Sequence, residues 1–310
     1  MLPECKVFDN LKRFLRPGTR SGKYMQLNIH GETETGMVRD HNEDCILILG
    51  GEKSPLGVDA LLVVADGMGG HAAGEVASRM TVDGIIGLMS RSDDLSSAED
   101  PEYLRFLGEV VQQVNNTVFQ SGQDEDKRGM GTTCTLAVVR GDQLFVSHVG
   151  DSRAYLLRAG DLHQITQDHS WVEEQVRQGA LSPEEARNHP NRNIITRAVG
   201  LEPRVEVDGY LVALANKDIL LLCSDGLTTM IEDSQIAEIL SANEPVEACR
   251  ALINAANAQG GHDNITVAVA RVNAKPSATL PVDADGDADT VEIKRTTYLW
   301  QRFTRSVLRR

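Results

Sequence analysis

The sequence predicts an α+β fold in which antiparallel sheets pack beneath helices. Short apolar segments rich in β-branched residues follow one another through tight turns, which is the pattern of hairpins. The expected order is strands, two helices, strands, two helices and a last strand. Because hairpins outnumber β-α-β units in this order, antiparallel sheets are favoured over a parallel sheet. With 310 residues, of which 41% are hydrophobic, the chain can form one large domain or two small ones.

The first half of the chain predicts a hairpin, two helices and three strands. Apolar runs at 45–49 and 61–65 are joined by a loop that contains Gly and Pro, as in a hairpin. In the second helix the apolar residues recur every three or four positions, which places them on one face. The two expected helices are 74–89 and 101–121, and the strands that follow are 132–139, 143–149 and 154–158.

The second half predicts an irregular insertion over 168–200, followed by strands and two helices. Within the insertion, one short helix is expected between Ser170 and Gly179. A second starts at Ser182, where the sequence Ser-Pro-Glu-Glu is typical of a capped helix start. The polar stretch HPNRN after it is typical of an exposed loop. The remaining strands are expected at 205–212, 218–223 and 265–272, and the helices at 234–240 and 246–258.

Charge is distributed unevenly along the chain. Residues 1–23 form a basic extension of charge +4, and residues 290–310 carry +5. Because the whole chain has a net charge of −14, the part between them carries −23. Such an acidic body excludes nucleic acid as its natural ligand and is compatible with cation binding. Residues 273–289 are rich in Ala, Pro and Asp and predict an acidic flexible linker.

Cysteine usage and hydropathy indicate the compartment. The five cysteines are odd in number and form no C-x-x-C pair, which favours free thiols in a reducing environment. No segment approaches the roughly 18 apolar residues of a membrane span. The N-terminus lacks the apolar core of a secretion signal. We therefore expect a cytoplasmic protein.

Acidic residues recur where the expected apolar strands begin or end. Each one alone is compatible with an ordinary turn, and Asp-Gly is a common turn sequence. Together they predict carboxylates that converge on one edge of the core, where their mutual repulsion requires counter-cations. An oxygen-only ligand set favours Mg²⁺ or Mn²⁺ over zinc and suits phosphoryl transfer to water. The residues are Glu43, Asp44, Asp66, Asp151, Asp225 and Asp263.

The chain resembles the bacterial form of the PPM/PP2C family of metal-dependent protein serine/threonine phosphatases. Each matching motif is weak alone, but their order along residues 24–272 is highly specific. The resemblance implies a phosphatase domain over 24–272, built as a four-layer α/β/β/α sandwich, with a variable flap at about 168–200. The motifs are GMVRDHNED (36–44), VADGMGGH (64–71), GMGTT (129–133), GDSR (150–153), SDG (224–226) and GHDNIT (261–266).

The resemblance also implies two principal metal sites for Mn²⁺ or Mg²⁺. Asp66 would bridge the two ions, and the Gly67 carbonyl would bind one of them. Asp225 and Asp263 would complete the other site. A water that bridges the two metals would then attack the phosphorus of a phosphoserine or phosphothreonine monoester.

Four further residues match family positions. Glu43 and Asp44 correspond to an acidic pair that acts directly or through bound waters, and Asp151 corresponds to the ligand of a third, weaker ion. Arg39 would clamp the substrate phosphate, which suits its planar guanidinium. Arg153 is interpreted as structural.

One position departs from many eukaryotic members of the family. Met68 stands where those members have a histidine that is proposed as the general acid, as it does in bacterial relatives. Protonation of the leaving group would then come from a metal-bound water or another residue. His41 and His71 are nearby in the sequence, and neither is assigned a role.

Three functions are compatible with these residues. The first is an active phosphatase for phosphoserine and phosphothreonine proteins, which reverses a serine/threonine kinase in bacterial signalling. The second is a pseudophosphatase that binds phosphoproteins without turnover, and the third is a phosphatase for a non-protein phosphomonoester. The set of metal-binding acids is complete, which favours an enzyme.

Residues 290–310 predict a basic amphipathic tail. On a helix, Leu299, Trp300, Phe303 and Val307 would share one face. An anionic membrane surface, an acidic partner and the enzyme's own acidic body are possible docking targets, and a solvated tail is the alternative. We favour a partner or membrane, and so expect deletion of 290–310 to leave phosphopeptide turnover intact.

Overall fold

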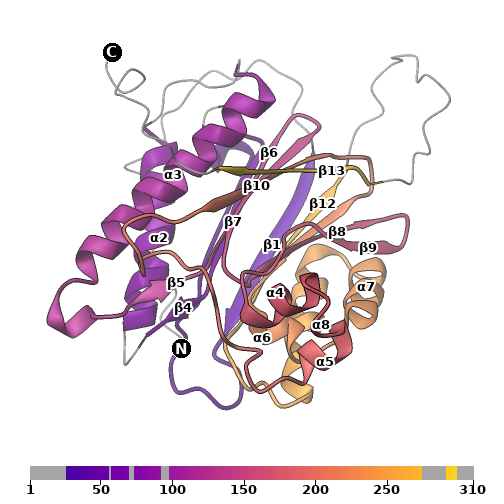
Figure 1. Ribbon diagram of the computed structural model, residues 1–310. Helices are drawn as coiled ribbons and strands as arrows, with labels where there is room; N and C mark the ends of the chain where they lie inside the picture. The colour runs from indigo at the N-terminus through magenta and orange to yellow at the C-terminus, as the bar shows by residue number, and fades with distance from the viewer. Residues whose placement is uncertain (1–25, 56, 70–72, 92–97, 274–290, 299–310) are drawn as a thin grey trace.

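The strands form two antiparallel sheets that lie face to face between helical layers (Figure 1). The computed structural model describes residues 26–55, 57–69, 73–91, 98–273 and 291–298. The expected N-terminal extension, nearly all of the linker, His71 and residues 299–310 lie outside this described part. Within it, no helix combines the length and apolar content needed to cross a lipid bilayer.

One sheet has five strands and the other has six, and a two-stranded ribbon adjoins them. The five-stranded sheet has the order β1 (Leu27–Glu34), β12 (Ile265–Val272), β11 (Ile219–Cys223), β8 (Arg153–Arg158), β9 (Asp161–Gln164). The six-stranded sheet has the order β13 (Ile293–Tyr298), β10 (Val207–Ala213), β7 (Gln143–Val149), β6 (Cys134–Arg140), β3 (Ala60–Ala65), β2 (Cys45–Gly50). The ribbon pairs β4 (Gly67–Met68) with β5 (Gly131–Thr132).

Helices cover the outer face of each sheet and so complete the predicted four layers. The six-stranded sheet carries α2 (Ala73–Met89) and α3 (Asp100–Ser121). The five-stranded sheet carries α6 (Asp225–Thr228), α7 (Asp233–Ala242) and α8 (Pro245–Ala258). The flap contains α4 (Trp171–Arg177) and α5 (Pro183–Arg187), and 3₁₀ turns occupy Gly51–Lys53 and Glu125–Lys127.

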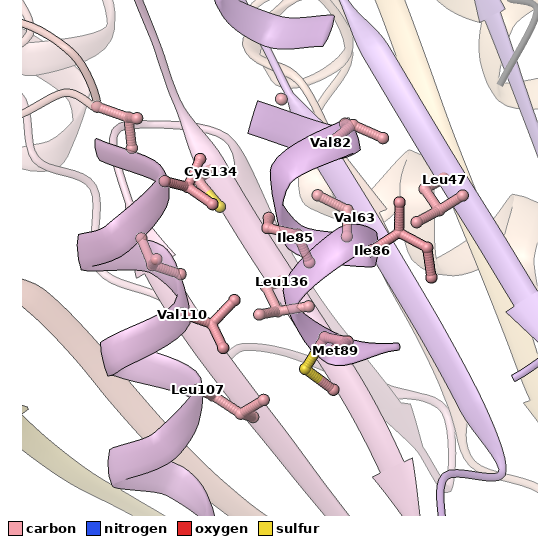
Figure 2. Close-up of a cluster of buried hydrophobic side chains, with 14 of the residues drawn as sticks. Leu47, Val63, Val82, Ile85, Ile86, Met89, Leu107, Val110, Cys134 and Leu136 are labelled. Atoms are coloured by element: carbon pink, nitrogen blue, oxygen red, sulfur yellow. The ribbon is translucent and has the colours of Figure 1, made fainter. Parts of the chain in front are cut away.

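The central strands are apolar throughout because both of their faces are covered. Along β3, Leu61 and Val63 contribute to the core beneath α2 and α3, whereas Leu62 and Val64 contribute to the core between the sheets. This alternation follows from the two-residue period of a strand. In Figure 2, apolar side chains of both helices lie over Val63 and Leu136. The layers therefore hold the ends of the strands in fixed positions.

The flap helices begin as the sequence predicts. Ser170 accepts a hydrogen bond from the backbone N–H of Glu173 at the start of α4. Ser182 and Glu185 form a reciprocal capping box at the start of α5. An isolated bridge between Thr132 and Val199 joins the backbone of the flap to the body, and a second bridge, between Ser170 and Ile195, lies within the flap.

The last described segment corrects the expected organisation of the C-terminal tail. Residues 293–298 were expected to belong to a tail separate from the domain, but they form β13, an edge strand paired with β10 along its length. Deletion of 290–310 would therefore remove a strand of the domain, so intact turnover no longer follows for that deletion. The apolar residues of the expected helix lie outside the described residues. Strand β9 and helix α6 were also not predicted.

Candidate metal and phosphate site

Strand register brings the predicted acidic residues to one end of the sheet pair. In the six-stranded sheet, Cys45 pairs with Ala65, which places Asp44 beside Asp66. Pairing of Cys134 with Val149 brings the start of β6 to the end of β7, just before Asp151. In the five-stranded sheet, β11 leads into Asp225 beside β12, which starts just after Asp263. The two sheets thus contribute carboxylates to the same edge.

The electrostatics of Asp66 show that these carboxylates are neighbours. Desolvation raises the pKa of Asp66 well above its ordinary value, and the negative charges of four other carboxylates raise it further. Those four belong to Asp44, Asp225, Asp151 and Asp263. Asp66 therefore lies among the other carboxylates of the acidic cluster.

The pKa values of Asp44, Asp225 and Asp151 are raised as well. Desolvation, with the charges of Asp225 and Asp263, raises the pKa of Asp44 to about 7, although the Thr266 hydroxyl opposes this shift by donating a 2.6 Å hydrogen bond. The pKa of Asp225 is raised to about 6, mainly by desolvation and then by Asp263. Desolvation, followed by the charge of Asp225, raises the pKa of Asp151 well above its ordinary value. Without cations, the cluster therefore binds protons near neutral pH.

The backbone around Asp66 is held by two threonines that the sequence analysis did not single out. The Asp66 N–H donates to the Thr133 hydroxyl at 2.9 Å, and the Asp66 carbonyl accepts from the Thr133 N–H at 2.8 Å. The Thr132 hydroxyl donates to the same carbonyl at 2.8 Å. These bonds fix the turn without involving the Asp66 carboxylate, which stays available as a ligand.

Gly67 lies where no side chain fits. A Cβ at this position would be 2.3 Å from the Gly74 carbonyl oxygen and 2.5 Å from the Glu43 carbonyl oxygen. The start of α2 and the loop before β2 can therefore approach the Asp66 turn closely. The pKa of Glu43 is raised by desolvation, partly opposed by Arg39 and by a hydrogen bond from the backbone of Gly74.

Arg39 and Asp263, which were predicted to serve phosphate and metal respectively, contact each other directly. Arg39 Nη2 is 2.8 Å from Asp263 Oδ2, and the arginine side chain is 51% exposed. Asn264 positions the loop that carries Arg39. Its side-chain amide donates to the carbonyls of Thr35 and His41, and its Oδ1 accepts from the Glu43 N–H at 2.8 Å. Sequence reasoning missed this role, for which only the Asp-Asn pair in the GHDNIT motif was a signal.

The residues present fit divalent cations. Asp44 Oδ1 and Asp151 Oδ1 are buried without a hydrogen-bond partner, which leaves them free to accept an ion. Among the described residues, no group of three or more Asp, Glu, His or Cys side chains is arranged to hold a metal ion by itself. Ions here would complete their coordination with water and with carbonyls such as that of Gly67. Mg²⁺ in particular tends to retain several waters.

Arg153, His41 and Met68 have other surroundings. Arg153 is structural, as interpreted, because its guanidinium forms three hydrogen bonds of 2.8–3.0 Å with Asp168 and one with the Tyr155 hydroxyl. His41 is exposed, and Met68 lies half-buried in β4. Neither residue is placed as a proton donor by a contact within the cluster.

An open cleft of about 460 Å³ extends from the cluster between the flap and α6–α7. Asp151 and Asp225 line it, together with Arg187 and Arg192 of the flap. The carboxylate cluster is therefore accessible to a ligand that also contacts the flap.

The raised pKa values predict how stability depends on metal and pH. In the metal-free protein, the protonated carboxyls of Asp44 and Asp225 stabilise the folded state. This contribution to stability is complete below about pH 4 and is lost as pH rises through 6–7. A cation competes with these protons, so it should stabilise the fold more at pH 8 than at pH 5.5. Mn²⁺ at about 100 times its Kd adds roughly 2.7 kcal/mol, or about 5–10 °C in Tm.

Thermal unfolding of chelator-treated protein, with and without Mn²⁺ at both pH values, measures this effect. The Asp66→Asn variant should lose most of the Mn²⁺-dependent shift. If Mn²⁺ shifted the Tm equally at pH 5.5 and pH 8, or at neither pH, the result would contradict the prediction that metal and protons compete for these carboxyls.

Comparison with known proteins identifies the family. The sequence profile described as "Protein phosphatase 2C" matches residues 53–269. The serine/threonine phosphatase stp of Listeria innocua serovar 6a is 41% identical over 249 residues, which covers 79% of this chain and 96% of the Listeria protein.

Solved structures agree with the sequence comparison. The serine/threonine phosphatase Stp1 from Staphylococcus aureus is 35% identical and superposes with a TM-score of 0.75, over 83% of this chain and 100% of Stp1. The PstP catalytic domain, crystallised with two manganese ions, is 37% identical with a TM-score of 0.68, over 80% of this chain and 98% of that domain. The chain therefore belongs to the protein phosphatase 2C family of metal-dependent protein serine/threonine phosphatases.

Proposed function

We propose that the acidic cluster of this protein hydrolyses phosphoserine and phosphothreonine monoesters in proteins, with two Mn²⁺ or Mg²⁺ ions and room for a third. One observation carries the proposal: the charges of four other carboxylates act on Asp66 at one end of the sheet pair. Carboxylates so arranged need cations, and divalent cations beside an open cleft suit the chemistry of phosphate esters.

The residues divide into holders of the cations and supports of those holders. Asp66 would bridge both principal ions, the Gly67 carbonyl would bind one of them, and Asp225 and Asp263 would complete the site of the other. The bound ions would lower the pKa of a water and offset the charge of the phosphate. The backbone hydrogen bonds of Asp66 favour this role because they fix the turn that carries the carboxylate before substrate arrives.

The remaining acidic residues would act at the edge of this centre. Glu43 and Asp44 would bind the first ion directly or through waters, and Asp151 would bind a third, weaker ion beside the cleft. Unpartnered buried oxygens on Asp44 and Asp151 support these roles. Met68 carries no titratable group, so proton transfer to the leaving oxygen would fall to water or another side chain.

Arg39 would bind the substrate phosphate. Its guanidinium is mostly exposed and now pairs with Asp263, whose charge a bound cation would neutralise. Replacement by Ala should raise KM about ten- to a hundredfold, because a charge-assisted contact is worth about 1.5–3 kcal/mol. Steady-state kinetics on a phosphoserine peptide, with Mn²⁺ binding measured in parallel, checks the prediction.

The matched control for Arg39 is Arg79→Ala. Arg79 is also exposed, and its described ion pair is with Glu75 one turn away on α2. This variant should keep the wild-type KM. An Arg39→Ala protein with unchanged KM would make Arg39 a surface residue.

The substrate class is tested by comparing phosphoserine and phosphothreonine peptides with small sugar phosphates. The proposal predicts metal-dependent phosphate release with a higher kcat/KM for the peptides. Preference for the small esters would favour a non-protein substrate. Tight phosphopeptide binding without any phosphate release in Mn²⁺ would instead identify a pseudophosphatase.

Two partners complete the proposal. The substrates would be targets of an opposing serine/threonine kinase, and residues 299–310 would dock to an acidic partner or an anionic membrane. Deleting 299–310, which leaves β13 in place, should preserve phosphopeptide turnover and reduce flotation with anionic liposomes or capture by the kinase. If neither changes, the tail has no docking role. If turnover changes instead, the tail acts on its own domain.

A further inference from the structure

Strand β13 lies beyond the region that matches the family profile, which ends at residue 269. In Figure 1 it runs along β10 at the edge of the six-stranded sheet. Its residue Arg295 reaches from this edge into the domain. Arg295 Nη2 is 2.7 Å from Asp208 Oδ2, and Nη1 donates to the Gln167 side-chain carbonyl. The guanidinium also lies 5.9 Å from the centre of the Tyr210 ring.

Asp208 connects Arg295 to the flap. Its side chain is fully buried, and its carboxylate also contacts His169 Nε2 at 3.1 Å and Arg197 Nη1 at 3.3 Å. A buried carboxylate depends on such partners, since removal of one leaves charge that is poorly compensated. Accordingly, hydrogen bonding to His169 and the neighbouring positive charges hold the pKa of Asp208 below its ordinary value despite its burial.

His169 carries the connection to the metal-site loop. Its ring atom Nδ1 accepts a 3.0 Å hydrogen bond from the Gly150 N–H, and its backbone N–H donates to the Gly150 carbonyl at 2.7 Å. Because Nδ1 is an acceptor, we assign the ring proton to Nε2, which donates it to Asp208, and Arg197 Nη1 lies 3.0 Å from the same nitrogen. Gly150 has φ +112°, and a Cβ there would lie 2.6 Å from the Thr133 side chain. The next residue is Asp151.

We infer that β13, through Arg295, Asp208 and His169, is a built-in positioning element for the loop that carries Asp151. Arg295 orients the Asp208 carboxylate, which fixes the ring of His169. The ring accepts the Gly150 N–H, while the backbone N–H of His169 holds the Gly150 carbonyl. Arg295 is thus a positioning residue with no contact to the reacting atoms. The consequence of this positioning for catalysis rests on the proposed role of Asp151 as a metal ligand.

Amide hydrogen exchange of the metal-free, full-length protein tests the positioning itself. The N–H groups of Gly150 and His169 report directly on the two clamping bonds. Arg295→Ala should speed exchange at both amides about tenfold or more, and the ¹⁵N resonances of the His169 ring should show a shift away from the Nε2–H tautomer. Arg295→Lys should restore part of the protection, since lysine supplies the charge without the guanidinium fork.

The matched control lies next to Arg295 on the same strand. Lys294 is 66% exposed, and its described ion pair is with Glu292 at 3.6 Å, so Lys294→Ala should leave both amides unchanged. In the active protein, Arg295→Ala should raise the Mn²⁺ concentration for half-maximal phosphopeptide turnover about three- to tenfold. This is below the 10–100-fold typical of residues bonded directly to a metal ligand.

The outcomes separate this inference from the proposed function. The inference is overturned if Arg295→Ala and Lys294→Ala give the same exchange at Gly150 and His169, or if the wild-type amides of β13 exchange as in an unpaired strand. Arg295→Lys, which keeps a cation on an intact β13, covers the case of an Ala variant that folds poorly, and its exchange at both amides should lie between those of the wild type and Arg295→Ala. Absence of phosphatase activity in the wild type would overturn the proposed function, while the exchange data would still decide the positioning role.

Discussion

Replacing Asp66 by Asn is expected to abolish phosphopeptide turnover while the fold stays intact. Asn has the same shape, and the backbone bonds from Thr133 do not involve the Asp66 side chain. The change replaces the carboxylate that lies among four other carboxylates by a neutral amide. It thereby removes the bridge between the proposed cations. The loss in kcat should be on the order of 10³-fold or more, since one well-placed electrostatic group supplies about 10²–10³.

The same substitution has an opposite effect on the metal-free fold. Removing one carboxylate from a mutually repelling cluster relieves repulsion, so the Tm of the chelator-treated variant should equal or exceed that of the wild type. Asp83→Asn on α2 makes the same change of net charge outside the cluster, and should keep wild-type kcat. Near-normal turnover by purified Asp66→Asn protein would refute the metal assignment.

The largest loss of stability is expected from Asp218→Ala. Asp218 is 1% exposed, and its carboxylate receives 2.9 and 2.6 Å hydrogen bonds from Arg158, together with the Ala215 N–H at 2.7 Å. The variant would leave the Arg158 guanidinium buried with its main anion removed. Breaking a buried pair in this way costs about 3–5 kcal/mol, a large share of the 5–15 kcal/mol typical of a domain.

Urea unfolding monitored by circular dichroism would measure this loss. The control is Asp124→Ala, whose partner Lys127 is at 3.2 Å on the surface and which should cost less than about 1 kcal/mol. Because the Arg158–Asp218 pair is no part of the carboxylate cluster, the Asp218→Ala protein should retain kcat at temperatures where it is folded. A loss below 1 kcal/mol would show that the pair contributes little.

Local pattern predicted most of the fold because the main elements are strongly periodic. The face formed by Leu107, Val111 and Val114 indicated α3, and the continuous apolar run of β3 indicated a strand covered on both sides. Strand β13 could not be predicted in this way. Its sequence IKRTTY is basic and mostly polar, and its strand conformation depends on pairing with β10, more than 80 positions earlier.

The candidate site divides similarly. Carboxylates at strand ends, such as Asp66 and Asp225, could be read from the sequence because strand ends are where turns and ligands occur. The supporting contacts could not. The bonds of Asn264 to the loop before β2, and of Asp208 to Arg295, join residues more than 80 positions apart, and only the tertiary structure brings them together.

The most direct measurement of the central claim is the position of Mn²⁺ in crystals of this protein. Diffraction data collected on both sides of the manganese absorption edge identify the ion without reference to activity. The account predicts anomalous peaks among the carboxylates of Asp66, Asp225 and Asp263, with Arg39 released from Asp263, and no such peaks in Asp66→Asn crystals. Peaks elsewhere, or none at this cluster under conditions that support phosphopeptide hydrolysis, would contradict it.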